Sequence, residues 1–313
     1  MCILFATRSH KEYELILISN RDEYLGRKTH ETCWHNDNFI LSPYDMSREE
    51  NHGNKIFGTW LGMNKKGKIA TILNLRRFSS IDLKELVKPR SRGLIPFTFL
   101  YSDWTNEDSF EEWETFEKFK SKYPFLQSSG DFNFFYGDIK EGNYRIIDSL
   151  GNTFKVLDNN NRNMIISNDL YQHKDEYEGK PTWGKIKIGA ERLNKFLKET
   201  ERSNEDEVLA KCFELASYCS IDSSITREEN PNKELAAETI YVPPLKVCPD
   251  EDIGLTKTNG KYYGTRTQIV VLVHKDRKHV TLVEHTIHNS DEEIYKYSGL
   301  NPKEVQRLDF TIT

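Results

Sequence analysis

A cysteine at the second position is the first residue of this sequence that could carry out chemistry. Removal of the initiator methionine is usual when the second residue is small, and it would leave Cys2 with both a thiol and a free α-amino group. The α-amino group titrates at ~7.7–8.0, so its neutral fraction can accept the thiol proton, directly or through water. Cys2 is therefore a candidate N-terminal nucleophile, although a Met-Cys start also occurs by chance.

A run of four polar residues, Asn20 to Glu23, follows an apolar segment of strand length. If that segment pairs with the first strand in a hairpin, its end lies beside the start of the chain, so that Arg21 and Asp22 reach Cys2. Asp22 would then hold the terminal ammonium, and Arg21 would lower the pKa of the thiol. A turn containing Asn and Asp, flanked by solvated charges, explains the same residues equally well.

The elements that must position these residues begin with strands. Apolar runs at 3–7 and 13–19 predict a hairpin, and the segments 56–63 and 68–75, joined by an Asn-Lys-Lys-Gly turn, predict a second one. Between the hairpins, the segment 34–54 contains Pro and Gly and is expected to be a long irregular connection.

The middle of the chain alternates between helical and strand patterns. Apolar residues recur at helical spacing in 103–122, 186–197 and 208–219, and Asn204 with Glu207 is typical of an N-terminal helix cap. Short strands are expected at 132–138, 144–148, 153–157 and 164–167.

The last third of the chain is rich in strand patterns. Strands are expected at 239–242, 262–273 and 280–285, after a loop at 220–232 and before a short helix at 291–298. Arg266 lies just ahead of the most apolar part of this region, and a buried arginine needs a polar partner. Strands at both ends with helices between them predict a single α+β domain, residues 1–313, whose terminal strands share a sheet.

Composition excludes several classes of protein. A net charge of −5 over 313 residues gives no basic footprint for nucleic acid. No apolar run approaches the ~20 residues of a membrane helix, and the N-terminal segment lacks the features of a secretory signal. The five cysteines are scattered without a CxxC pair, and the histidines lack metal-ligand spacing. We therefore expect a cytoplasmic protein with no disulfide framework, no metal site and no transmembrane segment.

Several motifs together resemble the NRDE family, named for Asn-Arg-Asp-Glu, whose animal members are called transport and Golgi organization proteins. The resemblance spans nearly the whole chain, with the motifs in the expected order. They are MCILFA, SNRDEYLGR, GTWLGMNKKGKIATILN, SRG, DFNFFYGD at 131–138, IISN at 165–168 with Trp183 shortly after, and YGTRTQIVVLV at 263–273.

A more distant resemblance, to choloylglycine hydrolases and penicillin V acylases, implies a fold and a mechanism. That group also begins Met-Cys and carries an Arg/Asn/Asp segment about twenty residues later. The implied fold is a four-layer αββα sandwich of the N-terminal-nucleophile (Ntn) hydrolase type. The order Asn-Arg-Asp differs from that group's Arg-Asn-x-Asp, which leaves the role of Arg21 open. The implied reaction centre comprises Cys2 as nucleophile, Asp22 as partner of its amine, Arg21 beside the thiol, Asn74 and Asn168 as oxyanion donors, and Arg266 next to Cys2.

Each residue of that centre also has a structural explanation: Asn74 and Asn168 could simply close turns at strand ends.

Three functions stay open. The first is a cysteine amidohydrolase or acyltransferase acting on a linear amide or acyl-type small molecule, with no cofactor required. The second, implied by the family's links to haem trafficking and lipid homeostasis, is a carrier or chaperone with haem or an acyl lipid as cargo. The third is a factor in secretory-pathway organisation.

Two smaller expectations accompany these functions. Cys248-Pro249 resembles the Cys-Pro pairs of some haem-responsive proteins, but an ordinary surface pair is the favoured explanation. The family links also leave association with mitochondria or the Golgi open beside the cytoplasmic location.

Overall fold

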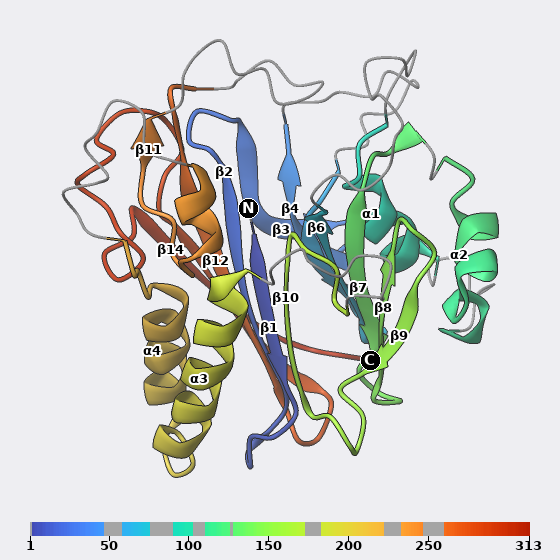
Figure 1. Ribbon diagram of the computed structural model, residues 1–313. Coiled ribbons are helices and arrows are strands. Elements are labelled where there is room, and N and C mark those ends of the chain that lie inside the picture. Colours follow the sequence, from blue (N-terminus) through green and yellow to red (C-terminus); the bar gives the residue numbers. More distant parts are fainter. Residues whose placement is uncertain are drawn as a thin grey trace. The chain divides into compact units, whose positions relative to one another are not determined.

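The computed structural model describes residues 2–46, 58–75, 90–102, 110–125, 128–172, 183–221, 233–246 and 260–313 (Figure 1). Its chain divides into two compact units. The first contains residues 1–27 and 162–310, and the second contains residues 28–161 and 311–313. Each unit is built on its own seven-stranded sheet.

The sheet of the first unit joins the two ends of the chain. Its strands run in the order β10-β1-β2-β12-β13-β14, with β11 paired to β12. The pairs β10–β1, β1–β2, β2–β12 and β12–β13 are antiparallel. The bounds are β1 Ile3–Thr7, β2 Tyr13–Tyr24, β10 Asn163–Ser167, β11 Leu245–Lys246, β12 Tyr262–His274, β13 His279–Thr286 and β14 Glu304–Thr311.

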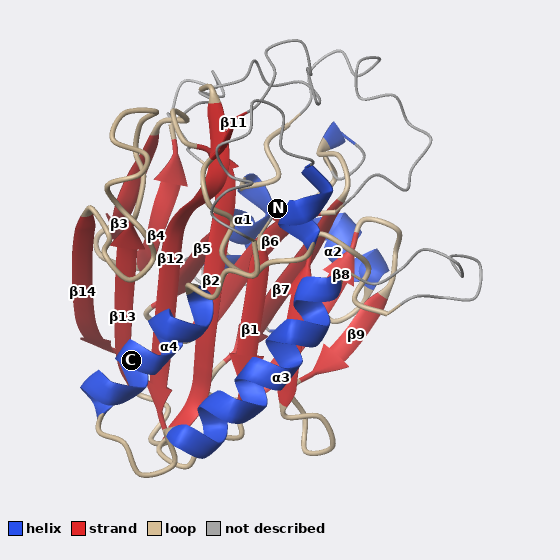
Figure 2. Cartoon of the chain, turned by 60° about the vertical axis from the view of Figure 1, so that its left-hand side comes forward, coloured by secondary structure: helices blue, strands red, loops and turns tan. Residues whose placement is uncertain are grey.

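Two helices, α3 (Gly184–Glu199) and α4 (Glu205–Ala216), cover one face of this sheet (Figure 2). Alternate residues of the strands, such as Ile3, Ile18 and Val270, form one buried core with apolar residues of both helices. This alternation follows from the two-residue repeat of a strand, which points every second side chain to the same face. The core therefore fixes which strand residues lie under the helices.

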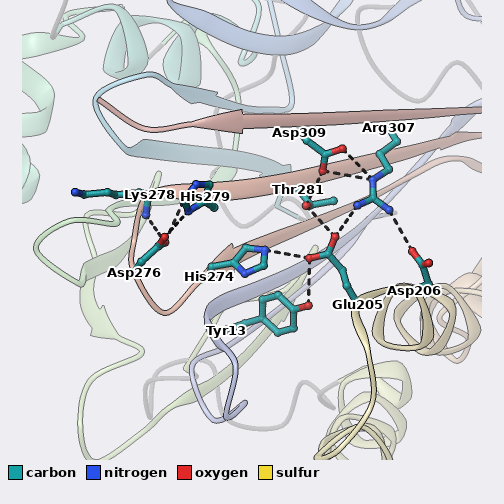
Figure 3. A network of polar contacts seen from close by, with 10 residues as sticks. All are labelled: Tyr13, Glu205, Asp206, His274, Asp276, Lys278, His279, Thr281, Arg307 and Asp309. Carbon is teal, nitrogen blue, oxygen red and sulfur yellow. Dashed lines mark hydrogen bonds and ion pairs between the residues drawn. The ribbon is translucent and has the colours of Figure 1, made fainter.

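Helix α4 is anchored at its N-terminus. The predicted cap is confirmed: the Asn204 side chain accepts from the Glu207 backbone N–H, and the Glu207 side chain accepts from the Asn204 backbone N–H. Glu205, in the first turn, meets side chains from β2, β12, β13 and β14 in a polar network (Figure 3). The network ties the helix to four strands of the sheet.

The second unit has the sheet order β3-β4-β5-β6-β7-β8-β9, with antiparallel neighbours. Helix α1 packs on its central strands, and an aromatic cluster that includes Phe99, Trp113 and Tyr136 fills its core. The bounds are β3 Thr29–His35, β4 Ile40–Asp45, β5 Leu61–Asn64, β6 Lys68–Asn74, β7 Phe132–Asp138, β8 Asn143–Asp148, β9 Thr153–Val156, α1 Leu94–Tyr101, α2 Phe116–Lys122 and the 3-10 turn η2 Phe110–Trp113.

The α+β class is confirmed, and the two sheet-and-helix units are the components that a four-layer αββα sandwich requires. The strands predicted in the first, middle and last parts of the chain mostly form, as do the helices at 184–199 and 205–216. The expectation of one domain over 1–313 stays a prediction. None of the helices in the described parts of the chain has the length and hydropathy of a membrane span.

Several element predictions were wrong. The expected loop at 34–54 begins instead with the β3–β4 hairpin, whose turn at 36–38 uses the left-handed backbone that Asn and Asp adopt readily. The expected helix at 291–298 is a series of bends and turns, because so short a segment forms a helix only with strong packing. Segment 239–242 forms no strand. The Val242 carbonyl accepts from the Thr265 backbone N–H of β12, but the Val242 N–H donates to the Thr265 hydroxyl, so no ladder continues.

Some predictions fall partly or wholly outside the described residues. Of the expected helix at 103–122, the described part is η2 and α2. The loop at 220–232 and the Cys248-Pro249 pair lie mostly or entirely outside the described ranges.

Candidate functional site

The start of the chain lies between two strands of the first sheet. Ile3 is opposite Asn20 of β2 on one side and opposite Ser167 of β10 on the other. Because both pairings are antiparallel, the next residue outward in each strand falls in the same row of the sheet. The Ser167 hydroxyl fixes this end of β1 by donating to the Cys2 carbonyl at 2.6 Å. The row consists of Asn168, Cys2 and Arg21.

Cys2 as a residue is half-buried, and its Sγ donates to the backbone oxygen of Asp22 at 3.9 Å. Burial raises the pKa of the Cys2 thiol, and the Asp22 carboxylate acts in the same direction. The hydrogen bond to the Asp22 backbone oxygen and the charge of Arg21 oppose this rise in the pKa. The environment therefore holds the thiol in its protonated form unless a nearby base removes the proton.

The Asp22 carboxylate is positioned by an irregularity in the neighbouring strand. In β12, Thr267 pairs with Arg21 and Thr265 pairs with Asp22, so Arg266 is an extra residue between two ladder pairs. Such a β-bulge redirects the side chains that follow it. As a result, the Thr265 hydroxyl donates to Asp22 Oδ1 at 2.7 Å. The Tyr263 hydroxyl also donates to the Asp22 backbone oxygen, at 3.1 Å.

A buried lysine that we did not predict from the sequence completes this environment. Lys185 lies in the first turn of α3, and its Nζ is 3.8 Å from Asp22 Oδ2, with both side chains 0% exposed. Burial raises the pKa of Asp22 and lowers the pKa of Lys185, and the opposite charge of the partner counters each shift. A cation in the first helical turn opposes the helix dipole, and that was the available signal in the sequence.

Arg266 is also buried, with 2% of its surface exposed. Its Nε donates to the Leu25 carbonyl at 3.3 Å, and its own carbonyl accepts from the backbone N–H groups of Ile287 and His288. The expectation that a buried arginine would have polar partners is therefore confirmed, whereas its role beside Cys2 stays a prediction.

The structure places five of the six predicted residues in or directly next to neighbouring strands of the first unit, in or beside the row that contains Cys2. Arg21 Nη2 lies 3.5 Å from Glu23 Oε2, and Asn168 is buried directly after β10. Asn74 belongs to the second unit, where it ends β6 opposite Phe132 with an exposed side chain. The site described here lies within the first unit, and the oxyanion role of Asn74 stays a prediction.

This arrangement supplies the groups that acyl transfer needs: a thiol, a carboxylate with two neighbours, and a nearby amide and guanidinium. Within the described ranges, no group of three or more His, Cys, Asp or Glu side chains is placed to hold a metal ion. The four described cysteines, Cys2, Cys33, Cys212 and Cys219, are free thiols.

Comparison with known proteins identifies relatives along the whole chain. An uncharacterized protein of Saccharomyces cerevisiae, YGR127W, is 46% identical over 322 residues, with 100% of each chain covered. A transport and Golgi organization protein 2 homolog of Bos taurus is 28% identical over 306 residues, covering 93% of this chain and 95% of the relative.

Among solved structures, penicillin V acylase from Agrobacterium tumefaciens matches with a TM-score of 0.42 and 14% identity, over 98% of this chain and 91% of that one. A likeness of that degree does not define a site. The sequence profile of the family described as Transport and Golgi organisation 2 matches residues 1–289. The chain therefore belongs to the Transport and Golgi organisation 2 family.

Proposed function

We propose that this protein is an N-terminal-nucleophile cysteine amidohydrolase or acyltransferase that acts on a linear amide or acyl-type small molecule. The observation that carries the proposal is the row Asn168, Cys2, Arg21, with the Asp22 carboxylate on the adjoining position of β2. These residues lie in or directly beside three neighbouring strands, and the pairing of those strands brings them to the start of the chain.

In the proposed reaction, the α-amino group of Cys2, freed by removal of the initiator methionine, takes the thiol proton. The sulfur then bonds to the substrate carbonyl carbon, and the carbonyl electron pair moves to the oxygen. The Asn168 amide would stabilise that oxyanion, a contribution of about 3 kcal/mol for one well-placed donor. Collapse expels the amine, which takes the proton from the terminal ammonium. Water or an acyl acceptor then resolves the thioester and regenerates the thiol.

The first test is the mass of the protein purified from its own host. The proposal requires a chain that begins at Cys2. Incubation with a panel of acyl amides and acyl-CoA esters should then add an acyl group to the N-terminal peptide and release product. Cys2→Ala should abolish both signals. Cys219→Ala is the matched control, because Cys219 is a half-buried thiol whose Sγ donates to a local carbonyl, that of Ile221. A processed chain that forms no acyl-enzyme and turns over no substrate would refute the proposal.

A carrier function is the second candidate, and one observation favours it: burial raises the pKa of the Cys2 thiol, which disfavours the nucleophilic thiolate. On this alternative, the same fold binds haem or an acyl lipid as cargo without chemistry. Titration with haem and with acyl chains of increasing length would then show saturable binding that survives Cys2→Ala. A role in secretory-pathway organisation would show neither turnover nor such binding.

A cytoplasmic location, with association to mitochondria or the Golgi, belongs with these proposals. Fractionation of the host cell, with the protein followed by antibody, tests it directly.

A further inference from the structure

The resemblance to known hydrolases assigns Asp22 to the terminal ammonium, but the carboxylate already has neighbours at both oxygens. Thr265 donates to Oδ1 at 2.7 Å, and the Lys185 ammonium lies 3.8 Å from Oδ2. Any terminal amine that binds Asp22 must therefore share it with a second, fully buried cation.

Lys185 occupies a helix position where a lysine is unfavourable for helix stability. It is in the first turn of α3, where a positive charge opposes the helix dipole, and no part of its side chain reaches solvent. Burying an ammonium is expensive unless it is paired. Asp22 forms the ion pair with this ammonium. The negative charges of Asp22 and Glu238 both act to raise the pKa of Lys185.

Gly184 allows the second of these carboxylates to approach. Its backbone N–H lies 3.4 Å from Glu238 Oε1, and a Cβ at position 184 would come within 1.8 Å of Glu238 Oε2. The Trp183 ring adds a cation–π contact, with its centroid 5.6 Å from Lys185 Nζ. The Lys185 ammonium is therefore flanked by the Asp22 carboxylate and the Trp183 ring, and the Glu238 carboxylate at the Gly184 N–H adds a further negative charge.

We infer that Lys185 is a positioning residue of the proposed active site. Its ammonium pairs with the Asp22 carboxylate, so the α-amino group of Cys2 stays unprotonated and can accept the thiol proton. This inference rests on the proposed function, because it assumes a chain that begins at Cys2. Two effects act in the same direction. Lys185 competes with the terminal ammonium for Asp22, and its positive charge repels a second positive charge nearby.

The titratable and charged groups around this position come from every element packed against it. Among the described residues they include Arg21, Asp22 and Glu23 on β2, Lys185 on α3, Glu238 and Tyr241 before β11, Tyr263 and Arg266 on β12, and Cys2 itself. Arg21 lies 3.5 Å from Glu23 Oε2, and Arg266 donates to the Leu25 carbonyl. Lys185 is the cation placed 3.8 Å from Asp22 Oδ2, so its removal changes the charge beside that carboxylate.

The experiment measures the pKa of the terminal amine in the full-length, processed protein. Reductive methylation labels only the neutral amine. Its rate, measured at a series of pH values by mass spectrometry of the N-terminal peptide, therefore follows the neutral fraction and gives the pKa of the amine. In Lys185→Met the amine should hold its proton to higher pH, and an amine whose pKa rises by about one is labelled about tenfold more slowly near neutral pH. Lys185→Arg, which keeps the charge, should restore the wild-type profile.

Two controls separate this effect from a general loss of structure. Lys187→Met removes an exposed lysine from the same turn of α3 and should leave the profile unchanged. Cys212, buried in the core between α4 and the sheet, should stay unreactive to iodoacetamide if the variant is folded. If Cys212 becomes reactive in Lys185→Met, Lys185→Gln replaces it, because Gln keeps a donor toward Asp22 without the charge.

A folded, processed Lys185→Met or Lys185→Gln protein with the wild-type amine profile would overturn the inference and leave the proposed function intact. An N-terminal peptide that still begins with methionine would overturn both. Slower labelling of these variants, in a protein whose wild type forms no acyl-enzyme, would overturn the proposed chemistry alone, because the charge relation between Lys185 and the amine would still hold.

Discussion

Two helices of the first unit each place a charged residue in their first turn, and each of these residues reaches the sheet. In α4, Glu205 accepts from Tyr13, Thr281 and Arg307 and pairs with His274 (Figure 3). In α3, Lys185 faces Asp22 with both side chains fully buried, whereas the Glu205 side chain is 24% exposed.

Helix stability explains the charge of Glu205 but does not explain the charge of Lys185. Glu205 has the sign that the helix dipole favours, it follows an N-cap, and water reaches its network. Lys185 has the opposite sign, and it is buried, where an ion pair gains little net stability over apolar packing. The α4 contacts are accounted for by folding alone, while the α3 pair points to the site around Cys2.

The largest effect is expected from removing the buried cation. Lys185→Ala leaves Asp22 buried without its ion-pair partner, and we expect a loss of about 3 kcal/mol in the free energy of unfolding. Urea denaturation measures it. Lys187→Ala, at an exposed position of the same helix, should change stability by less than ~0.5 kcal/mol. Equal stability of the two variants would contradict a buried, paired Lys185.

A smaller loss is expected at the exposed network. Glu205→Ala removes an acceptor shared by four side chains and a favourable first-turn charge, so it should cost about 1–2 kcal/mol. Asp206→Ala is the matched control in the same turn, because its side chain is 87% exposed and should contribute ~0.5 kcal/mol or less. The prediction fails if the two variants unfold at the same urea concentration.

Salt should distinguish the two regions. At 1 M NaCl the screening length falls to ~3 Å, so part of the Glu205→Ala effect should disappear as the exposed charges are screened. The Lys185→Ala effect should persist, because solvent ions do not reach a pair with 0% exposure. Urea denaturation of both variants and the wild type at low and high salt gives the comparison. A loss of the Lys185→Ala effect at high salt would show that solvent ions reach the pair.

The smallest effect is expected at Asp276, in the turn between β12 and β13 (Figure 3). The Lys278 backbone N–H lowers the pKa of Asp276 to about 2, with further help from His279. A depressed carboxyl pKa stabilises the fold above the unfolded value of ~3.9, and this contribution is lost as the pH falls through about 2. The melting temperature of Asp276→Asn should therefore lie slightly below that of the wild type at pH 6, and the gap should close toward pH 2.

Sequence patterns predicted the regular elements best where one face is apolar. The strands at 3–7 and 262–273 and the helices at 186–197 and 208–219 were recognisable because burial of one face imposes a period of two or of 3.6 residues. Helix α1 was missed because its residues are apolar on every side, which gives no periodicity. Strand β14 was missed because its exposed residues include many charges.

For the site, the sequence by itself determined that Cys2 meets Arg21 and Asp22. An antiparallel hairpin is a local structure, and its register follows from the apolar residues of its two strands. Only the tertiary structure decided that Thr265 and Lys185 share the Asp22 carboxylate. Those contacts depend on a bulge in β12 and on how α3 docks on the sheet, and neither the position of a bulge nor a helix docking geometry is fixed by the periodicity of the chain.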